Sequence, residues 1–325
     1  MQKKEANQGN STTTPPKTRI IYRRRVSPFI KKFESTPKGV ICPHFYVLSH
    51  ANGCLYNCAY CYLKYTMRNT LLQEQQKPAP TVFTNTGEMR EQLLKWASET
   101  HEPALINTGE LSDSFLDTAY LDMIFKTLAF DRNFRQRHTM LFVTKGGENV
   151  VEALQQYPAL KNFIVSFSVS TNAALYEMDA PHVLERLEAA RVLRERGWRI
   201  RLRLDPLVPE DLGGSVDPKN IIEMCVKADP ERVTLGSLRF AFGWKFNPML
   251  RKATCESDHC GYNGKAFKMR VPLSKRIEMY EKVITALRAC GYREWVGFCK
   301  ETTAIFKHFD LNINRPICNC SLFGD

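Results

Sequence analysis

The chain lacks the long apolar runs of membrane proteins and the apolar leader of exported ones. No stretch approaches the roughly 18–20 consecutive apolar residues that a membrane helix requires. The N-terminal sequence MQKKEANQGNSTTTPPK contains no hydrophobic segment of the signal-peptide kind. No internal repeat is visible either. We therefore expect a cytoplasmic protein without membrane association, and its 325 residues with 43% hydrophobic content suffice for one large domain or two modest ones.

Cysteine is plentiful, with 11 residues. In a reducing compartment disulfides do not persist, and an odd number of cysteines cannot all pair with one another. The composition therefore favours metal or cluster ligation over a disulfide framework.

Positive charge is concentrated near the N-terminus. The formal net charge is +12, and residues 1–40 hold ten Lys or Arg against two Glu. Residues 1–16 are polar and show no hydrophobic periodicity, so we expect residues 1–40 to form a basic, disordered arm. Such an arm either binds the phosphates of a nucleic acid by counterion release or is a solvated tail.

From residue 45 onward, short apolar runs alternate with amphipathic segments of helical length, which is typical of βα units around a parallel sheet. Strands are predicted at 45–49, 104–108, 140–144, 163–169, 199–204 and 232–235. Helices are predicted at 55–72, 87–98, 117–128, 148–156, 183–196 and 218–227. Six units are too few for a closed eight-stranded barrel, so the sequence predicts an α/β fold with an open, partial (β/α)6 TIM-like barrel over residues 41–237. Residues 238–325 are predicted to be a cysteine-containing extension that completes the barrel, with helices at 273–289 and 301–309.

The strongest motif directly follows the first predicted strand, where CLYNCAYC supplies Cys54, Cys58 and Cys61. Three thiolates at this spacing can hold an iron–sulfur cube and leave one iron open for a substrate. Zinc bound by these cysteines and His50 is an alternative. A third reading, three buried apolar cysteines, is disfavoured because polar Asn57 lies among them.

This CxxxCxxC motif, with an aromatic residue before its last cysteine, resembles that of the radical S-adenosylmethionine (SAM) superfamily. The resemblance implies that Cys54, Cys58 and Cys61 hold a [4Fe-4S] cluster whose open iron chelates the methionyl group of S-adenosylmethionine. It also implies one-electron reduction by a flavodoxin- or ferredoxin-type donor, which cleaves the molecule to a 5′-deoxyadenosyl radical.

The resemblance implies further cofactor contacts at the ends of the next strands. Gly109 and Glu110 stand where the superfamily has a GGE-like motif, so Gly109 would allow close backbone approach and Glu110 would accept from the ammonium group. An ordinary turn is the alternative. Ser168 resembles the position that contacts ribose and carboxylate. Lys145 suits a carboxylate or phosphate, or is a solvated lysine.

Within the superfamily, residues 40–215 resemble the spore photoproduct lyase family, through Cys-x-Tyr-Cys-Tyr-Leu at 58–63, Leu-Ser-Asp at 111–113 and Val-Thr-Lys at 143–145. Enzymes of that family repair DNA by reversing a thymine–thymine photodimer, beginning with hydrogen abstraction. By resemblance, Tyr60 and Tyr62 occupy the places of a tyrosine pair that relays hydrogen. The family's donor cysteine aligns with Glu110, so either Cys42 or Cys299 donates hydrogen here or the reaction differs.

Two further groups of residues admit competing readings. Cysteines of the C-terminal part form a candidate auxiliary iron–sulfur or zinc site, or are unrelated thiols: Cys255, Cys260, Cys299, Cys318 and Cys320. Arg199, Arg201 and Arg203 alternate along one strand and share a face. That face either binds phosphate at the barrel mouth or pairs with Glu188 and Glu195 of the preceding helix.

The sequence thus predicts a radical SAM enzyme with lyase-like chemistry that acts on DNA or another nucleic acid. Two alternatives remain. One is a non-catalytic zinc or iron–sulfur protein that binds nucleic acid, and the other is a radical SAM enzyme that acts on a peptide or metabolite.

Overall fold

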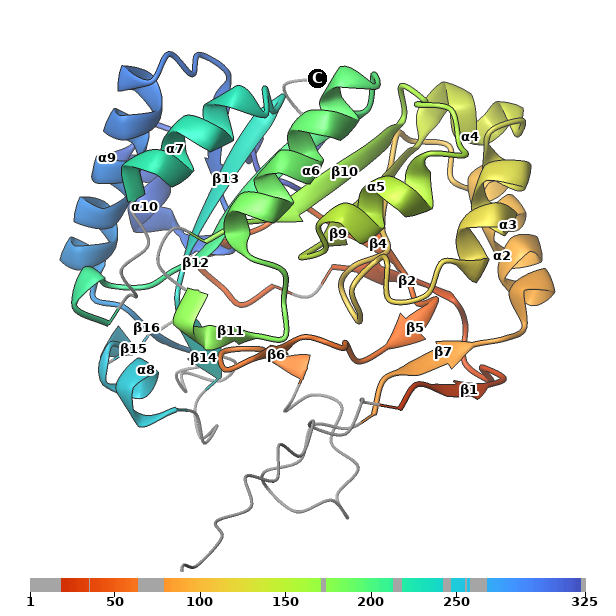
Figure 1. Cartoon of the computed structure of the whole chain (residues 1–325), viewed down its shortest axis with the longest axis horizontal. Coiled ribbons are helices and arrows are strands. Elements are labelled where there is room, and N and C mark those ends of the chain that lie inside the picture. Colours follow the sequence, from red (N-terminus) through yellow and green to blue (C-terminus); the bar gives the residue numbers. More distant parts are fainter. Residues whose placement is uncertain are drawn as a thin grey trace, which may run out of the picture.

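The computed structural model describes residues 19–34, 36–63, 79–170, 174–212, 218–241, 247–254, 256–257 and 268–322 (Figure 1). Within these ranges, every helix is too short or too polar to span a bilayer.

The centre of the molecule is one curved sheet of eight strands in the order β17-β13-β12-β10-β9-β8-β4-β2. Seven of them run parallel, and β2 pairs antiparallel with β4 at one end. The strands are β2 Ile30–Phe33, β4 Phe45–Leu48, β8 Leu105–Asn107, β9 Thr139–Thr144, β10 Phe163–Ser168, β12 Arg199–Leu207, β13 Arg232–Ser237 and β17 Trp295–Phe298. All six predicted strands are confirmed, and β17 adds a seventh parallel strand that the sequence analysis missed.

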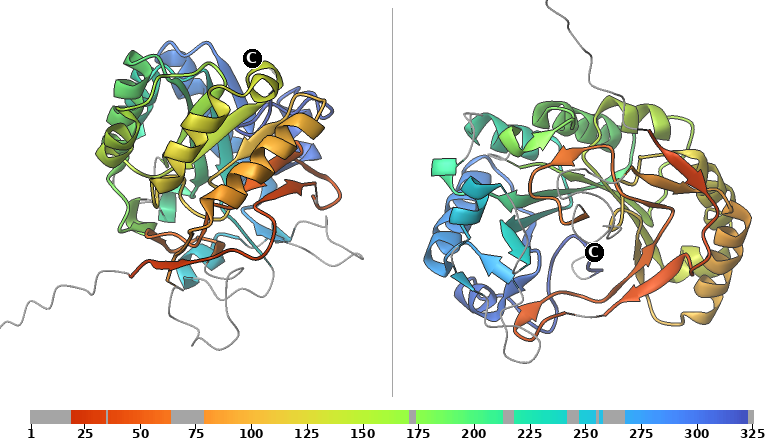
Figure 2. Two further views of the ribbon diagram at one scale, coloured as in Figure 1. Left: turned by 90° about the vertical axis from the view of Figure 1, so that its right-hand side faces the viewer. Right: turned by 90° about the horizontal axis from the view of Figure 1, so that it is seen from below.

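Helices cover the outside of this sheet, which curls into an open ring (Figure 2). They are α2 Thr86–Glu99, α3 Ala119–Leu128, α4 Arg132–Arg137, α5 Glu148–Leu154, α6 Val183–Glu195, α7 Pro218–Lys227, α9 Leu273–Ala289 and α10 Thr303–His308. The short helix α8 Pro248–Lys252 lies apart from them, at the bottom of Figure 1. The end strands β17 and β2 are not paired with each other in the described part of the chain. The predicted partial barrel is therefore confirmed, and the ring is open.

Most of the parallel strands are largely apolar on both faces, which is why these segments read as hydrophobic runs. β12 is the exception, because three arginines alternate along one of its faces. In β9, Met140 and Phe142 pack into the large core beneath the helices. The alternate residues Leu141 and Val143 belong to a smaller cluster on the other face. This alternation places the side chains of odd-numbered β9 residues inside the ring.

Short strands gather at one end of the ring, at the bottom of Figure 1. They are β1 Ile21–Arg23, β5 Ala51–Asn52, β6 Asn57–Cys58, β7 Thr81–Phe83, β11 Glu177–Met178, β14 Arg239–Ala241, β15 Glu256–Ser257 and β16 Lys268–Arg270. A further antiparallel pair, β3 Val40–Ile41 with β18 Glu301–Thr302, joins a segment near the N-terminus to one near the C-terminus. Because β5 and β6 follow β4 in the chain, this end of the ring carries the carboxyl ends of the parallel strands.

Two expectations need correction. Residues 19–40 are not a disordered arm, because they contain β1, which pairs with β7, and β2, which pairs with β4; residues 1–18 lie outside the described ranges. The predicted helix at 55–72 is wrong over 55–62, where the chain forms β6 and turns. The remainder of that prediction, apart from residue 63, also lies outside the described ranges.

The C-terminal segment enters the ring (Figure 2) and satisfies buried arginines there. Arg201 donates to the carbonyls of Asn319 and Ser321, at 2.7 and 3.0 Å. Arg232 donates to the carbonyl of Ser321 at 2.9 Å. The segment passes so close to β17 that a Cβ on Gly297 would overlap the carbonyl oxygen of Ile317. The tail is therefore part of the interior of the fold.

The three arginines of β12 share one face, as predicted, but their partners differ from those expected. Arg199 and Arg201 both bind Glu231, which precedes β13, at 2.6 Å. The helix residues Glu188 and Glu195 bind Arg191 instead. The pairing with the preceding helix is therefore wrong, and the neighbouring strand supplies the carboxylate.

Candidate active site

The three motif cysteines lie in the loop that leaves β4 at the carboxyl end of the ring. This loop is anchored at both ends: Gly53 N donates to Leu111 O at 2.8 Å, and Ala59 N donates to Tyr176 O at 2.7 Å. Its middle forms β6, which pairs with β11 so that Cys58 lies opposite Glu177. The position is the one that the motif predicts, at the first βα connection.

Glu177 is the centre of a buried charge network beside this loop. Its side chain is 2% exposed and pairs with Lys145 Nζ at 2.8 Å and Arg186 Nη1 at 2.6 Å. It also accepts a hydrogen bond from the Tyr60 hydroxyl. Burial alone would raise the pKa of Glu177, but the two cations outweigh it and lower the pKa, so the carboxylate is ionised.

Arg186 links the same network to the end of β10, because it donates to the Ser168 carbonyl at 3.0 Å. The structure therefore brings Tyr60, Lys145 and Ser168 together around Glu177. The sequence analysis missed Glu177, which belongs to no recognisable motif. The segment that begins at Arg186 resembles the lyase family, but no role was predicted for Arg186, because its pairing with Glu177 is visible only in the fold.

Lys145 is positioned by Asp113, which lies in the loop after β8. The Asp113 carboxylate accepts from the Lys145 backbone N–H at 2.8 Å and from the Thr144 hydroxyl at 2.9 Å. Burial raises its pKa, although these hydrogen bonds oppose that shift. The loop after β8 is thereby fixed against the end of β9.

Gly109 lies at the end of β8, where no side chain fits. A Cβ there would lie 2.6 Å from Val143 Cβ and 2.7 Å from Val143 O. The next residue, Glu110, accepts from Lys300 Nζ at 3.3 Å, and its carbonyl accepts from the Tyr62 hydroxyl. The space beside Gly109 is thus filled by β9, and the Glu110 carboxylate already has a cationic partner. The cofactor contacts expected of both residues stay predictions.

A second polar group lies at the ends of β12, β13 and β17. Asp205 pairs with Arg203 at 2.8 Å and with Arg239 at 3.0 Å. Both guanidinium groups also donate to Cys299 Sγ, at 3.6 and 3.5 Å, and Lys300 follows Cys299 in the chain. We call these five residues the arginine–thiol cluster. Sequence reasoning named Arg203 and Cys299 but did not connect them.

The remaining auxiliary candidates divide into two sets. Cys255 and Cys260 lie outside the described residues, while Cys318 and Cys320 hydrogen-bond to each other in the tail inside the ring. Cys42 lies near enough to Cys299 and Cys320 for both to raise its pKa, although burial is the main cause of its rise to about 12. The auxiliary metal site stays a prediction.

His50, the fourth ligand of the zinc alternative, is buried beside Ser112 and Tyr120. Its Nε2 lies 3.0 Å from the Ser112 hydroxyl, and its ring stacks on Tyr120 with centroids 4.0 Å apart. Burial lowers its pKa to about 3, so it is neutral. Among the described residues, no three His, Cys, Asp or Glu side chains gather around one point as a single metal ion requires.

A [4Fe-4S] cluster makes a different demand from a single ion, because each thiolate binds its own iron. The donor set fits such a cluster: three thiols come from one loop, Cys58 is buried, and Cys54 and Cys61 are partly buried. The residues present are therefore chemically suited to the cluster.

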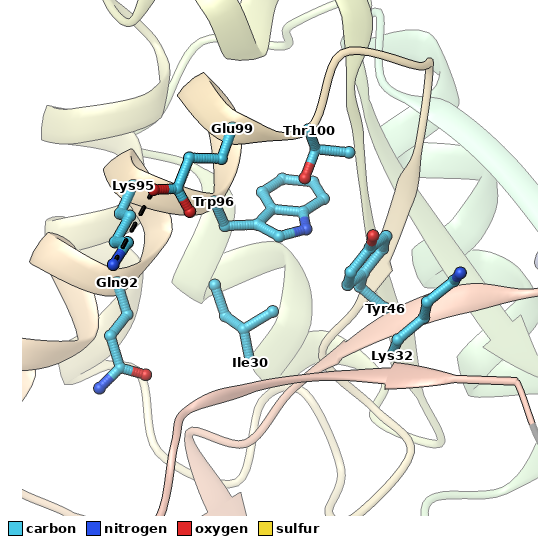
Figure 3. Close-up of a pocket in the computed structure, with 8 residues that line it drawn as sticks. All are labelled: Ile30, Lys32, Tyr46, Gln92, Lys95, Trp96, Glu99 and Thr100. Carbon is cyan, nitrogen blue, oxygen red and sulfur yellow. Dashed lines mark ion pairs between the residues drawn. The ribbon is translucent and has the colours of Figure 1, made fainter.

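One pocket of about 240 Å³ lies apart from these residues, between β2 and α2 (Figure 3). Its walls include Ile30, Tyr46 and Trp96, and the exposed ion pair Lys95–Glu99 lies at its edge. It contains none of the residues that the motifs single out.

The open ring of parallel strands is a partial-barrel fold that is also found in solved structures. Comparison with solved structures finds spore photoproduct lyase in complex with dinucleoside spore photoproduct, with a TM-score of 0.64 and 17% identity over 86% of this chain and 82% of that one. A variant of the lyase with bound AdoMet and dinucleoside spore photoproduct matches with a TM-score of 0.60 and 16% identity, over 85% and 81% of the two chains. No protein-family profile and no curated protein sequence matches the chain. The likeness shows the shared fold and confirms that part of the predicted resemblance.

Proposed function

We propose that the protein is a radical SAM enzyme that acts on DNA or another nucleic acid by hydrogen abstraction, in the manner of the spore photoproduct lyase family. The observation that carries the proposal is the position of Cys54, Cys58 and Cys61. They lie in the first βα connection of an open parallel ring, at the end where such folds place their chemistry. Residues 41–237 supply the core in this proposal, and residues 238–325 complete it.

In the proposed enzyme, the three cysteines hold a [4Fe-4S] cluster. When bound, this cluster supplies an electron, drawn from a flavodoxin- or ferredoxin-type donor, for reductive cleavage of S-adenosylmethionine. The chain's own residues orient the methionyl group: Lys145 and Ser168 face its carboxylate, and Gly109 leaves room for backbone approach. Lys145 then shares its charge between Glu177 and the bound carboxylate. The Glu110 carboxylate lies at the end of β8, where the ammonium group is expected.

Tyr60 and Tyr62 flank Cys61 and are proposed to relay hydrogen. Their hydroxyls are fixed, the first on Glu177 and the second on the Glu110 carbonyl. Cys299 is the better placed of the two proposed hydrogen donors, because its thiol lies near enough to Tyr62 to affect the pKa of that residue. Burial and neighbouring Asp205 raise the pKa of the Cys299 thiol, which keeps the S–H bond that a donor needs.

The test is anaerobic reconstitution, followed by iron counting, electron paramagnetic resonance (EPR) of the reduced protein with and without S-adenosylmethionine, and chromatography for 5′-deoxyadenosine. We expect about four irons per chain, an EPR spectrum that changes when S-adenosylmethionine is added, and formation of 5′-deoxyadenosine. Cys58→Ala should abolish all three, while Cys290→Ala, a change at the end of α9, should abolish none. Zinc without iron and without cleavage would contradict the proposal and favour a non-catalytic nucleic-acid-binding protein.

A further inference from the structure

The arginine–thiol cluster carries charge that the proposed chemistry of S-adenosylmethionine does not use. Its members come from three places: Arg203 and Asp205 from β12, Arg239 from β14, and Cys299 and Lys300 from the segment after β17. Three of the five are cations. All lie at the same end of the ring as the cysteine loop.

The guanidinium groups of Arg203 and Arg239 share a poor hydrogen-bond acceptor, the sulfur of Cys299. Arg203 Nη2 and Arg239 Nη2 both donate to Cys299 Sγ, at 3.6 and 3.5 Å. A thiol sulfur accepts hydrogen bonds only weakly, whereas an anionic oxygen forms the strong, charge-assisted kind with guanidinium. Arg203 Nε, in addition, is buried and has no hydrogen-bond partner in the described part of the chain. The donors of this cluster are therefore arranged for an oxyanion better than for the sulfur they contact.

The charge of the cluster points to a single negative charge on the ligand. Arg203, Arg239 and Lys300 are 19%, 13% and 23% exposed, so water shields them only in part. In the described part of the chain they form ion pairs with two carboxylates, Asp205 and Glu110. A third carboxylate, Glu301, also attracts Arg239 but is itself paired with Arg270 and Arg276. Arg203, Arg239 and Lys300 therefore carry one positive charge in excess of their ion-pair partners. A charge that is largely removed from water is costly to leave unpaired.

We propose that Arg203, Arg239 and Lys300 bind a phosphodiester of the substrate. This inference deepens the proposed function and rests on it. A phosphodiester carries one negative charge, and its tetrahedral oxygens can accept from donors that approach from three strands. Asp205 already supplies the planar carboxylate between the two arginines, so the ligand adds a second anion beside it.

The site lies next to the residues proposed to react. Lys300 binds Glu110, whose carbonyl holds the Tyr62 hydroxyl. A phosphodiester at the cluster would therefore hold the adjoining nucleoside beside Tyr62 and Cys299.

The first test uses the protein with its iron–sulfur cluster reconstituted. It compares the binding of thymidylyl-thymidine (TpT) with the binding of the methylphosphonate analogue of TpT, which has the same shape but no charge. We expect the neutral analogue to bind at least about tenfold more weakly, since hydrogen bonds between charged groups are lost. Lys300→Gln should weaken TpT binding and reduce the difference between the two probes. Lys282→Gln, which breaks an exposed pair with Glu210 on the outside of the ring, should change neither.

The second test reads the site directly through Cys299. Trypsin releases Cys299 alone in residues 294–300 and Cys290 alone in 289–293, so alkylation by iodoacetamide can be followed at each thiol separately. TpT should slow alkylation of Cys299 and leave Cys290 unchanged. This measurement uses the unmodified protein and does not depend on whether a variant folds.

Equal binding of TpT and the methylphosphonate, or equal protection of Cys299 by both, would overturn the inference. Stronger protection by acetate than by TpT would also overturn it, in favour of a carboxylate ligand. These outcomes leave the proposed function intact if 5′-deoxyadenosine still forms. Charge-dependent TpT binding without any cleavage of S-adenosylmethionine would instead contradict the proposed function.

Discussion

Glu177 lies directly opposite Cys58 in the antiparallel β6–β11 pair, while its carboxylate accepts from Tyr60 two residues further on. One residue therefore holds both the backbone and a side chain of the cysteine loop. Lys145 and Arg186 in turn hold the carboxylate from β9 and α6. The loop that is proposed to carry the cluster is thus held to the ring by this acidic side chain in addition to the backbone hydrogen bonds of Gly53 and Ala59.

Glu177→Gln should strongly destabilise the protein. Removing one partner of a buried ion pair typically costs about 3–5 kcal/mol, because the opposite charge is left unpaired. The measurement is the free energy of unfolding from urea titration. Glu188→Gln, which breaks an exposed pair with Arg191, is the matched control and should have little effect. Similar losses in the two variants would show that Glu177 has no special structural role.

Gly297→Ala should displace the C-terminal segment, because the added Cβ would overlap the Ile317 carbonyl. We expect a loss of about 1–3 kcal/mol, as for other overpacked sites. Gly87→Ala is the control: it lies in α2 with no atom within 4 Å of the added Cβ. That change should be neutral or stabilise by up to about 1 kcal/mol, since alanine favours helix. Thermal unfolding of both variants checks the prediction.

Acid should destabilise the protein in part through Glu301. This fully buried carboxylate accepts from Tyr280 at 2.7 Å and pairs with Arg276. Burial alone would raise its pKa, but Arg270 and Arg276 outweigh that effect and lower it. The stabilisation is therefore present above the unfolded pKa of about 4.3 and is lost as the pH falls toward the lower folded value.

Measuring the free energy of unfolding between neutral and acid pH tests this assignment. Glu301→Gln should reduce stability at neutral pH and make the remaining loss in acid shallower than in the unmodified protein. An unchanged slope in the variant would assign the acid sensitivity to other carboxylates.

Tyr62→Phe should separate cleavage of S-adenosylmethionine from repair. The change removes only the hydroxyl that binds the Glu110 carbonyl and leaves the cysteine ligands intact. We expect 5′-deoxyadenosine to form still, but less nucleic-acid product to form for each S-adenosylmethionine molecule that is cleaved. The reason is that the proposed tyrosine relay loses the hydroxyl hydrogen that it would transfer. Chromatography of both products from one reaction gives the ratio. An unchanged ratio would exclude Tyr62 from the relay.

Much of the ring could be predicted because most of its strands are largely apolar on both faces. Runs such as residues 139–144 and 163–168 are continuous, and all six predicted strands are confirmed. β17 was missed because its first residue, Trp295, is exposed and Gly297 interrupts the apolar pattern. The helix predicted from residue 55 failed because β11, from a distant part of the chain, pairs with residues 57–58. The hydrophobic periodicity of a short segment does not show which distant strand will pair with it.

The candidate site was predictable where the residues form a motif and not where they act through distant partners. The spacing of the cysteines alone identifies the motif formed by Cys54, Cys58 and Cys61. Asp205 and Arg203 share a face two residues apart, which is a usable signal, but Arg239 joins them only through the fold.

The tail inside the ring has a consequence for synthesis of the chain. Arg201 and Arg232 obtain their carbonyl acceptors from residues 318–321, so the interior of the ring is incomplete until those residues have left the ribosome. The parallel sheet can assemble earlier only with buried guanidinium groups lacking these acceptors, which is unfavourable. Completion of the fold, and assembly of any cofactor in it, therefore requires residues 318–321 to have been synthesised and to have entered the ring.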